Sequence, residues 1–253
     1  NKLKFTNLKD NAKLSYLNNG YGLSLSSGWS CPGAKSCKSR VFVENDKLKV
    51  VDNKDIKFRC LSPSLESRFP RLYEKNKYNF NLLKRKTEEE MFNLLVDSLP
   101  TKAKIIRLNI FGDIFNEKYY RALCRLAKEF PHILFYGYTK SVLYWISNLD
   151  LVPSNFILTA SRGGRWDNLI DTYNLKNVTV VFSEQEAKDR GLEIDHDDKL
   201  AYEGTKNFAL LLHGTQMAGS VAAKALSKLK GISGYSKKKN IFNKNLIDIL
   251  TKE

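Results

Sequence analysis

Residues 105–139 read IIRLNIFGDIFNEKYYRALCRLAKEFPHILFYGYT, and this stretch decides the fold. The apolar run Ile105–Phe111 predicts a buried strand that ends in the turn Gly112-Asp113. Apolar residues at helical spacing predict a helix over Lys118–Phe130, and Ile133–Thr139 predicts the next strand. A strand, a helix and a second strand in this order are typical of a parallel βαβ unit.

The alternation continues along the chain. Thr87 followed by three glutamates predicts the start of a helix within the helical region Pro70–Leu99. The chain therefore reads as one α/β domain, 1–253, with a parallel sheet or partial (β/α) barrel. Its parts are an N-terminal region (1–69), βα repeats (70–231) and a basic tail (232–253). Further strands are expected at Phe156–Ala160, Val178–Phe182 and Phe208–His213, and further helices at Val142–Leu149, Glu184–Arg190 and Met217–Lys230.

The N-terminal region has two expected features besides an edge strand within Lys2–Leu8 and a strand at Gly22–Ser26. The turn Glu44-Asn45-Asp46 between two apolar-rich runs predicts a β-hairpin. Cys31, Cys37 and Cys60 are spaced C-x5-C-x22-C, so the hairpin would bring the third cysteine back beside the first two. Three grouped thiols are consistent with an iron–sulfur cluster, a zinc site, a disulfide or three small core residues, and we favour a cluster.

Composition limits the classes of partner. The chain has 253 residues, with 42 Lys and Arg against 27 Asp and Glu, a formal net charge of +15. Such a charge favours polyanions such as nucleic acid or nucleotides, although scattered lysines are also typical of a merely Lys-rich sequence. No run approaches the length of a membrane span and no signal peptide opens the chain, so we expect no membrane and a cytoplasmic location.

Polar or glycine-rich residues follow all five predicted core strands, in the sequences FGDIF, YTKS, ASRGG, FSEQ and HGTQ. The carboxyl ends of parallel strands meet at one edge of a sheet, where ligands usually bind. A pocket for an anionic or nucleotide-like ligand is therefore expected here, although each residue also has a purely structural interpretation. The predicted lining residues are Asp113, Lys140, Ser161, Arg162, Gly163, His213 and Gln216.

Several separated motifs carry a resemblance to a known family. They are CPGAxxC, FRC-x-S-x-x-x-E-x-R-x-P, IRL-x-x-x-GD-x-F-x-x-x-Y, F-x-x-YTKS and HGTQ-x-AGS. Together they resemble an uncharacterised phage-encoded "gene product 88-like" family over residues 22–230, which implies a viral protein expressed in the host cell. More distantly the chain resembles radical S-adenosylmethionine (SAM) proteins, whose cluster loop is a compact C-x3-C-x2-C. This likeness implies a radical-SAM-like partial barrel related to the TIM barrel.

Two hypotheses follow. The first is an iron–sulfur protein whose [4Fe–4S] cluster is held by Cys31, Cys37 and Cys60 beside the anion pocket, with redox or Lewis-acid chemistry. SAM or a nucleotide is a further cofactor that no motif supports. The alternative is a basic nucleic-acid-binding phage protein with a structural metal. Cys124 is interpreted mainly as a core residue and otherwise as a fourth ligand, and the acidic stretch 195–198 as a solvated loop or a site for a cation.

Overall fold

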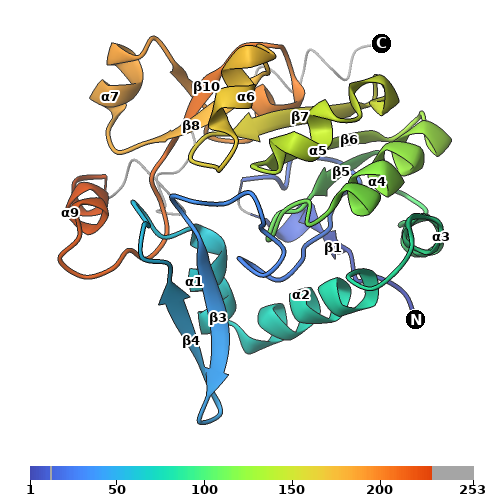
Figure 1. Cartoon of the computed structure of the whole chain (residues 1–253), viewed down its shortest axis with the longest axis horizontal. Coiled ribbons are helices and arrows are strands. Elements are labelled where there is room, and N and C mark those ends of the chain that lie inside the picture. The colour runs from blue at the N-terminus through green and yellow to red at the C-terminus, as the bar shows by residue number, and fades with distance from the viewer. Residues whose placement is uncertain (12, 230–253) are drawn as a thin grey trace.

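The computed structural model describes residues 1–11 and 13–229. Within them, eight strands form one sheet in the order β1-β2-β5-β6-β7-β8-β10-β9, and β3 and β4 form a separate hairpin (Figure 1). All neighbours in the large sheet are parallel except β1 and β2. The strands are β1 (Thr6–Asn7), β2 (Gly20–Gly22), β3 (Ser39–Glu44), β4 (Lys47–Asp52), β5 (Ile105–Leu108), β6 (Leu134–Thr139), β7 (Phe156–Ser161), β8 (Asn177–Val181), β9 (Glu193–Ile194) and β10 (Phe208–Leu211).

Helices connect the parallel strands, so the expected α/β class is confirmed. The sheet is open, because its two edge strands β1 and β9 do not pair with each other, and it forms no closed barrel. The likeness to radical SAM proteins stays a prediction, and the basic tail 232–253 lies outside the described residues. The helices are η1 (Leu8–Asp10), α1 (Leu61–Arg68), α2 (Pro70–Leu83), α3 (Glu88–Ser98), α4 (Glu117–Glu129), α5 (Val142–Ile146), η2 (Leu149–Leu151), α6 (Asp167–Thr172), α7 (Glu184–Asp189), α8 (Lys199–Tyr202) and α9 (Val221–Lys228).

The two faces of the sheet are covered differently. Side chains alternate along each strand, so Ile106, Leu108 and Phe135 point to one face, where they pack with apolar residues of α2 to α6. Tyr136 and Phe208 point to the other face, where the segment after η1 and the short helix α8 cover them. In the part of the chain that the structure describes, no helix combines the length and apolar character that crossing a bilayer requires.

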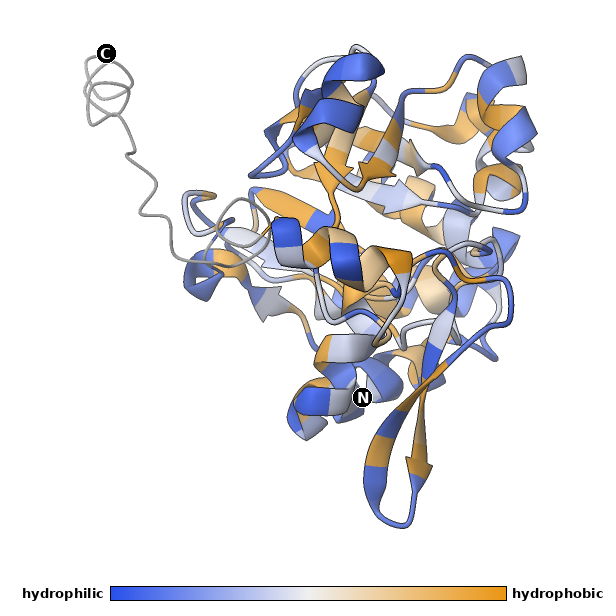
Figure 2. Cartoon of the chain, turned by 90° about the vertical axis from the view of Figure 1, so that its left-hand side faces the viewer, coloured by the Kyte–Doolittle hydropathy of each residue, from blue (hydrophilic) through white to orange (hydrophobic). Residues whose placement is uncertain are grey.

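The β3–β4 hairpin projects away from the sheet and carries both apolar and charged residues (Figure 2). Asn45 and Asp46 both have positive φ, of 48° and 57°, which is the backbone conformation of a tight type I′ turn. Asn and Asp tolerate this region better than other residues with a side chain. The hairpin predicted from Glu44-Asn45-Asp46 is therefore confirmed.

Several element boundaries differ from the expectations. The predicted strand Gly22–Ser26 is largely outside the ladder, although Leu23 and Leu25 still donate backbone hydrogen bonds to Arg107 and Phe111. The last helix begins only at Val221, because Gly219 has a φ of +76° and the hydroxyl of Ser220 caps the helix. The elements β9, α6 and α8 are too short to give a clear periodic signal in the sequence.

Candidate functional site

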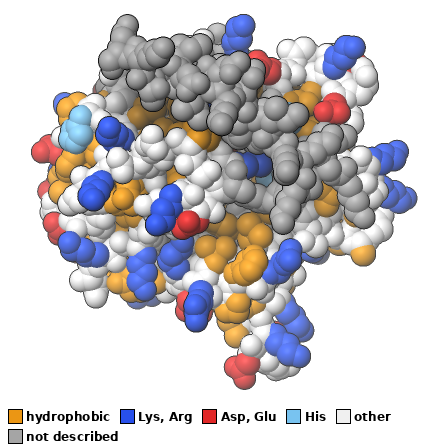
Figure 3. All heavy atoms as spheres, turned by 180° about the vertical axis from the view of Figure 1, so that it is seen from behind, with side chains coloured by type: hydrophobic (Ala, Val, Ile, Leu, Met, Phe, Trp, Pro, Cys, Tyr) orange, Lys and Arg blue, Asp and Glu red, His pale blue; other side chains and the backbone are white. Residues whose placement is uncertain are grey.

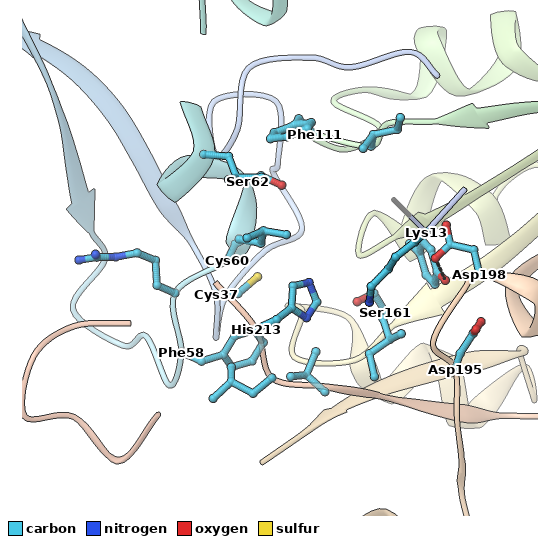
Figure 4. A pocket seen from close by; sticks show the side chains of 18 of the residues that line it. Lys13, Cys37, Phe58, Cys60, Ser62, Phe111, Ser161, Asp195, Asp198 and His213 are labelled. Carbon is cyan, nitrogen blue, oxygen red and sulfur yellow. Dashed lines mark hydrogen bonds between the residues drawn. The ribbon is translucent and has the colours of Figure 1, made fainter. Parts of the chain in front are cut away.

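A cavity of about 230 Å³ opens at the carboxyl edge of the sheet, which is the set of C-terminal ends of β5, β6, β7, β8 and β10. Its floor comes from these strands, and its wall comes from residues 58–60 and the first turn of α1, up to Leu65. In Figure 4, Cys37 and His213 lie toward one side of the pocket, and Ser161, Lys13 and Asp198 lie toward the other. The cavity thus joins the cysteine loop, which is the loop that carries Cys31 and Cys37 between β2 and β3, to the parallel sheet.

Lys140, at the end of β6, supplies a buried positive charge to this cavity. Its Nζ atom donates to the hydroxyl and the carbonyl oxygen of Ser161 at 2.7 and 3.0 Å, and to the carbonyl of Arg162 at 2.5 Å. All three acceptors are neutral, and no ion pair among the described residues includes Lys140. The ammonium is therefore held in place by dipoles, and an anion beside it would replace neutral partners with a charged one.

His213, just after β10, supplies a hydrogen-bond acceptor. Its Nδ1 lies 2.8 Å from the carbonyl oxygen of Leu211, and a carbonyl can only accept, so Nδ1 carries the hydrogen. Burial lowers the pKa of His213 below its usual value, which keeps the ring neutral at physiological pH. The Nε2 atom of the neutral ring then has a free lone pair and can accept a proton or a hydrogen bond from a bound molecule.

The acidic stretch 195–198 forms one end of the cavity, and its three aspartates are buried or half-buried while His196 is exposed. Asp198 accepts hydrogen bonds from the hydroxyls of Tyr136 and Tyr138, each at 3.2 Å, and pairs with Arg107 at 3.0 Å. Asp195 is 95% buried, and among the described residues its Oδ2 atom has no hydrogen-bond partner. Burial raises the pKa of Asp195 above its usual value. A buried carboxylate oxygen without a partner invites a donor such as a hydroxyl or an amine.

Of the ligand-binding residues predicted from the sequence, Lys140, Ser161 and His213 line the cavity. Their role in binding stays a prediction. Arg107 was missed by sequence reasoning, and Asp195 was considered only as part of the acidic stretch 195–198, as a solvated loop or a site for a cation. Arg107 could have been found from the sequence, because it is a charged residue within the otherwise apolar run IIRL. Asp195 could not, because an acidic turn such as 195–198 is usually exposed.

The other predicted residues have partners within the protein. Asp113 is buried and accepts hydrogen bonds from the hydroxyl of Thr139 at 2.7 Å and from the backbone of Lys140 at 2.9 Å, so it fixes the end of β6. Gln216 bonds the backbone of Arg59 in both directions, at 2.7 and 3.0 Å, and ties the loop after β10 to the start of α1.

The SRGG sequence after β7 also makes intramolecular contacts. Arg162 pairs with Asp171, and its guanidinium also donates to Asn177. The backbone amides of Gly163 and Gly164 donate to the carboxylate of Asp167 at 2.7 and 2.8 Å. The anion expected at these glycine amides is therefore an Asp side chain of the protein itself.

The iron–sulfur hypothesis is wrong. Among the described residues, no group of three or more His, Cys, Asp or Glu side chains is arranged to hold a metal ion. This finding overturns both the [4Fe–4S] cluster of the first hypothesis and the structural metal of the alternative one. Cys31, Cys37 and Cys60 are free cysteines. Burial raises the pKa of Cys31 well above its usual value and that of Cys37 to about 11, so both groups are protonated thiols near pH 7.

Cys124 is a core residue, as its main interpretation predicted. It lies in α4 among the apolar residues that pack on the first face of the sheet, and it is 2% exposed. Burial is the main factor that raises the pKa of this thiol, to about 12. It therefore behaves as a small apolar side chain far from the carboxyl edge.

Comparison with known proteins places this arrangement in a family. A family model described as Gene product 88 matches residues 1–230. The chain belongs to the Gene product 88 family. No curated protein and no solved structure matches the chain. In this Gene product 88 protein all cavity residues, from Lys13 to His213, lie within the matched range, so the cavity is built entirely from the part of the chain that defines the family.

Proposed function

We propose that the protein binds a small anionic ligand, of mononucleotide size or smaller, at the carboxyl edge of the sheet. The observation that carries the proposal is the buried ammonium of Lys140 at a cavity wall, held by neutral oxygen atoms and without an ion-pair partner among the described residues. A phosphate or carboxylate beside it would gain a charge-assisted hydrogen bond in a poorly solvated place.

The two ends of the cavity support a ligand with two kinds of polar group. The anionic group belongs near Lys140, where the hydroxyl of Ser161 can donate to it, whereas Nε2 of the neutral His213 ring accepts from a hydroxyl of the ligand. A hydroxyl or amine belongs near Asp195, whose Oδ2 atom needs a donor. A phosphate joined to a sugar has both features, and this is why a nucleotide-like ligand fits the site better than a simple anion.

The cavity volume limits the size of the ligand. Pockets for drug-sized ligands usually measure about 300–1,000 Å³, and this cavity has about 230 Å³. A mononucleotide, a sugar phosphate or a small carboxylate therefore matches its size better than a dinucleotide does. Apolar walls from Leu65, Val180 and Leu210 would contact the uncharged part of the ligand.

The test compares AMP, adenosine and inorganic phosphate as probes in isothermal titration calorimetry. We expect AMP to bind more tightly than adenosine, and Lys140→Gln to reduce this preference about ten- to a hundredfold, because a hydrogen bond to a charged group contributes about 1.5–3 kcal/mol. Lys176→Gln is the matched control. The ammonium of Lys176 also donates to backbone carbonyls, those of Ala201 and Gly204 at 2.9 and 3.0 Å, but it does not line the cavity.

The proposal fails if neither AMP nor phosphate binds to the folded protein. It also fails if both Lys→Gln variants keep the preference for AMP, because the charge of Lys140 would then not contact the ligand. Circular dichroism of each variant shows whether the fold is intact, so a loss of binding by unfolding is recognised.

A further inference from the structure

The β3–β4 hairpin carries a second, separate surface. Side chains on paired antiparallel strands share a face, so Arg40, Phe42 and Glu44 lie on the same side as Lys47, Lys49 and Val51. Trp29 extends this side, because its ring packs edge-to-face on Phe42 with 5.0 Å between centroids. We call the set formed by Trp29, Arg40, Phe42, Lys47 and Lys49 the aromatic–basic face.

Two aromatic rings of this face are open to solvent. Trp29 is 45% exposed and Phe42 is 37% exposed. The indole nitrogen of Trp29 donates to the carbonyl oxygen of Val41 at 3.1 Å, which fixes the ring against the strand. The guanidinium of Arg40 lies over the Trp29 ring, 4.8 Å from its centroid. The rings are therefore held rigidly at the surface instead of being buried in the core.

The charges around the rings are mostly unpaired cations. Glu44 forms an ion pair with Lys49. It is the one acidic residue among the six strand residues named for this side of the hairpin, so its charge is neutralised. In the part of the chain that the structure describes, no ion pair includes Arg40, Lys47 or Lys38. Partial burial, and then the neighbouring charges of Arg40 and Arg165, lower the pKa of Lys38. Cations that lie this close to one another favour a polyanion over a neutral partner.

We propose that the aromatic–basic face of the hairpin binds single-stranded nucleic acid. Bases would stack on Trp29 and Phe42, and phosphates would contact Arg40 and Lys47. Exposed rings between cations are the combination by which proteins bind single strands without reading a sequence. At the bottom of Figure 3, Lys and Arg side chains lie at the projecting end of the hairpin, next to an acidic side chain at its tip.

This inference is independent of the ligand cavity, and its test uses different variants. The full chain is titrated into fluorescent oligothymidylate or oligouridylate of about 16 nucleotides, and binding is followed by fluorescence anisotropy. We expect Phe42→Ala to weaken binding about five- to a hundredfold, the loss typical of one stacked base. Tyr173→Ala is the matched control, because Tyr173 is another exposed ring (47% exposed) outside the hairpin.

A second variant tests the charges and does not endanger the fold. Lys47 is exposed beside the hairpin turn, and Lys47→Gln is expected to reduce the slope of log Kd against log salt concentration by about one. Three results would overturn the proposal. They are an affinity of Phe42→Ala equal to that of the wild type, a salt slope unchanged in Lys47→Gln, and no binding of the oligonucleotide by the wild type at roughly 50 mM salt. Sedimentation that reveals a dimer lost in Phe42→Ala, with unchanged oligonucleotide affinity, would assign the face to a second copy of the chain instead.

Discussion

Glu66 in α1 is a buried carboxyl group whose partners are neutral. It is 1% exposed, and it accepts hydrogen bonds from the side chain of Asn76 at 2.8 Å and from the backbone of Ser27 at 3.2 Å. Desolvation outweighs these hydrogen bonds and raises the pKa of Glu66 from about 4.5 to about 7. The folded protein therefore keeps a proton on Glu66 at a pH where the unfolded chain has lost it.

This pKa gives stability a defined pH dependence. Below about pH 4.5 both states are protonated, and between about 4.5 and 7 only the folded state is, so the free energy of unfolding falls as pH rises through this window. Glu66→Gln removes the charge and keeps an acceptor oxygen. We expect the variant to match the wild type near about pH 4.5 and to exceed it by up to about 3 kcal/mol near about pH 8 in urea denaturation.

Two results would contradict this account of Glu66. One is a stability difference between Glu66→Gln and the wild type that is the same at both pH values. The other is a variant that becomes less stable as pH rises. Asp97→Asn is a suitable control, because Asp97 is an exposed carboxylate in α3 and is expected to change stability little at either pH.

At the residue scale, sequence reasoning located Lys140, Ser161 and His213 beside the cavity because each lies at the carboxyl end of a predictable strand. It could not show which polar groups were already satisfied. Asp167 occupies the glycine amides through a contact made three and four residues away, and Asp195 is buried by distant parts of the fold. The burial of Asp195 depends on tertiary packing, which a single sequence does not report, whereas the contact of Asp167 is local and depends on the conformation of the loop after β7.

At the element scale, the cysteine loop is positioned by its contact with the ends of β6 and β7. The amide of Arg165 donates to the carbonyl of Gly33 at 2.8 Å, and the amide of Ser36 donates to Gly163 at 2.9 Å. A Cβ atom on Gly33 would lie 2.3 Å from the carbonyl oxygen of Lys140, which is a severe clash with backbone. Glycine is therefore required here for the loop to approach β6.

We expect Gly33→Ala to detach the cysteine loop and to make Cys37 react faster with a thiol reagent than in the wild type. Cys37 is buried in the docked loop, and reaction requires it to be accessible. Cys124 is the internal control, because it lies in α4 and does not depend on this loop. Peptide mapping distinguishes the sites. Equal labelling of Cys37 in both proteins, or equally faster labelling of Cys124, would contradict local detachment.

The elements that the sequence predicted best carry strong local signals. Thr87 and Glu90 form a capping box that starts α3, and Asn45-Asp46 forms the hairpin turn. We expect Thr87→Ala to lower the free energy of unfolding by about 1 kcal/mol, the usual effect of losing an N-cap, when measured by chemical denaturation. No loss of stability would show that the cap contributes nothing. Lys102→Ala, an exposed change outside any helix, provides the baseline.

At the scale of the whole molecule, hydrophobic periodicity predicted the parallel βα arrangement. Buried strands appear as short apolar runs and amphipathic helices as apolar residues at helical spacing, so their alternation can be recognised in the sequence. The meaning of the cysteines did not follow. Spacing brought three thiols to one region, but burial keeps Cys31 and Cys37 protonated, and a sequence does not reveal desolvation. The open edge strands of the sheet also depend on long-range pairing, so the sequence could not separate an open sheet from a barrel.

The central claim is that the cavity at the carboxyl edge binds a small anionic ligand beside Lys140. The most direct measurement is a crystal structure of the protein soaked with AMP. The account predicts density for the phosphate group within hydrogen-bonding distance of Lys140 Nζ, with the sugar directed toward Asp195. An empty cavity at saturating AMP, or AMP bound only elsewhere on the surface, would contradict it.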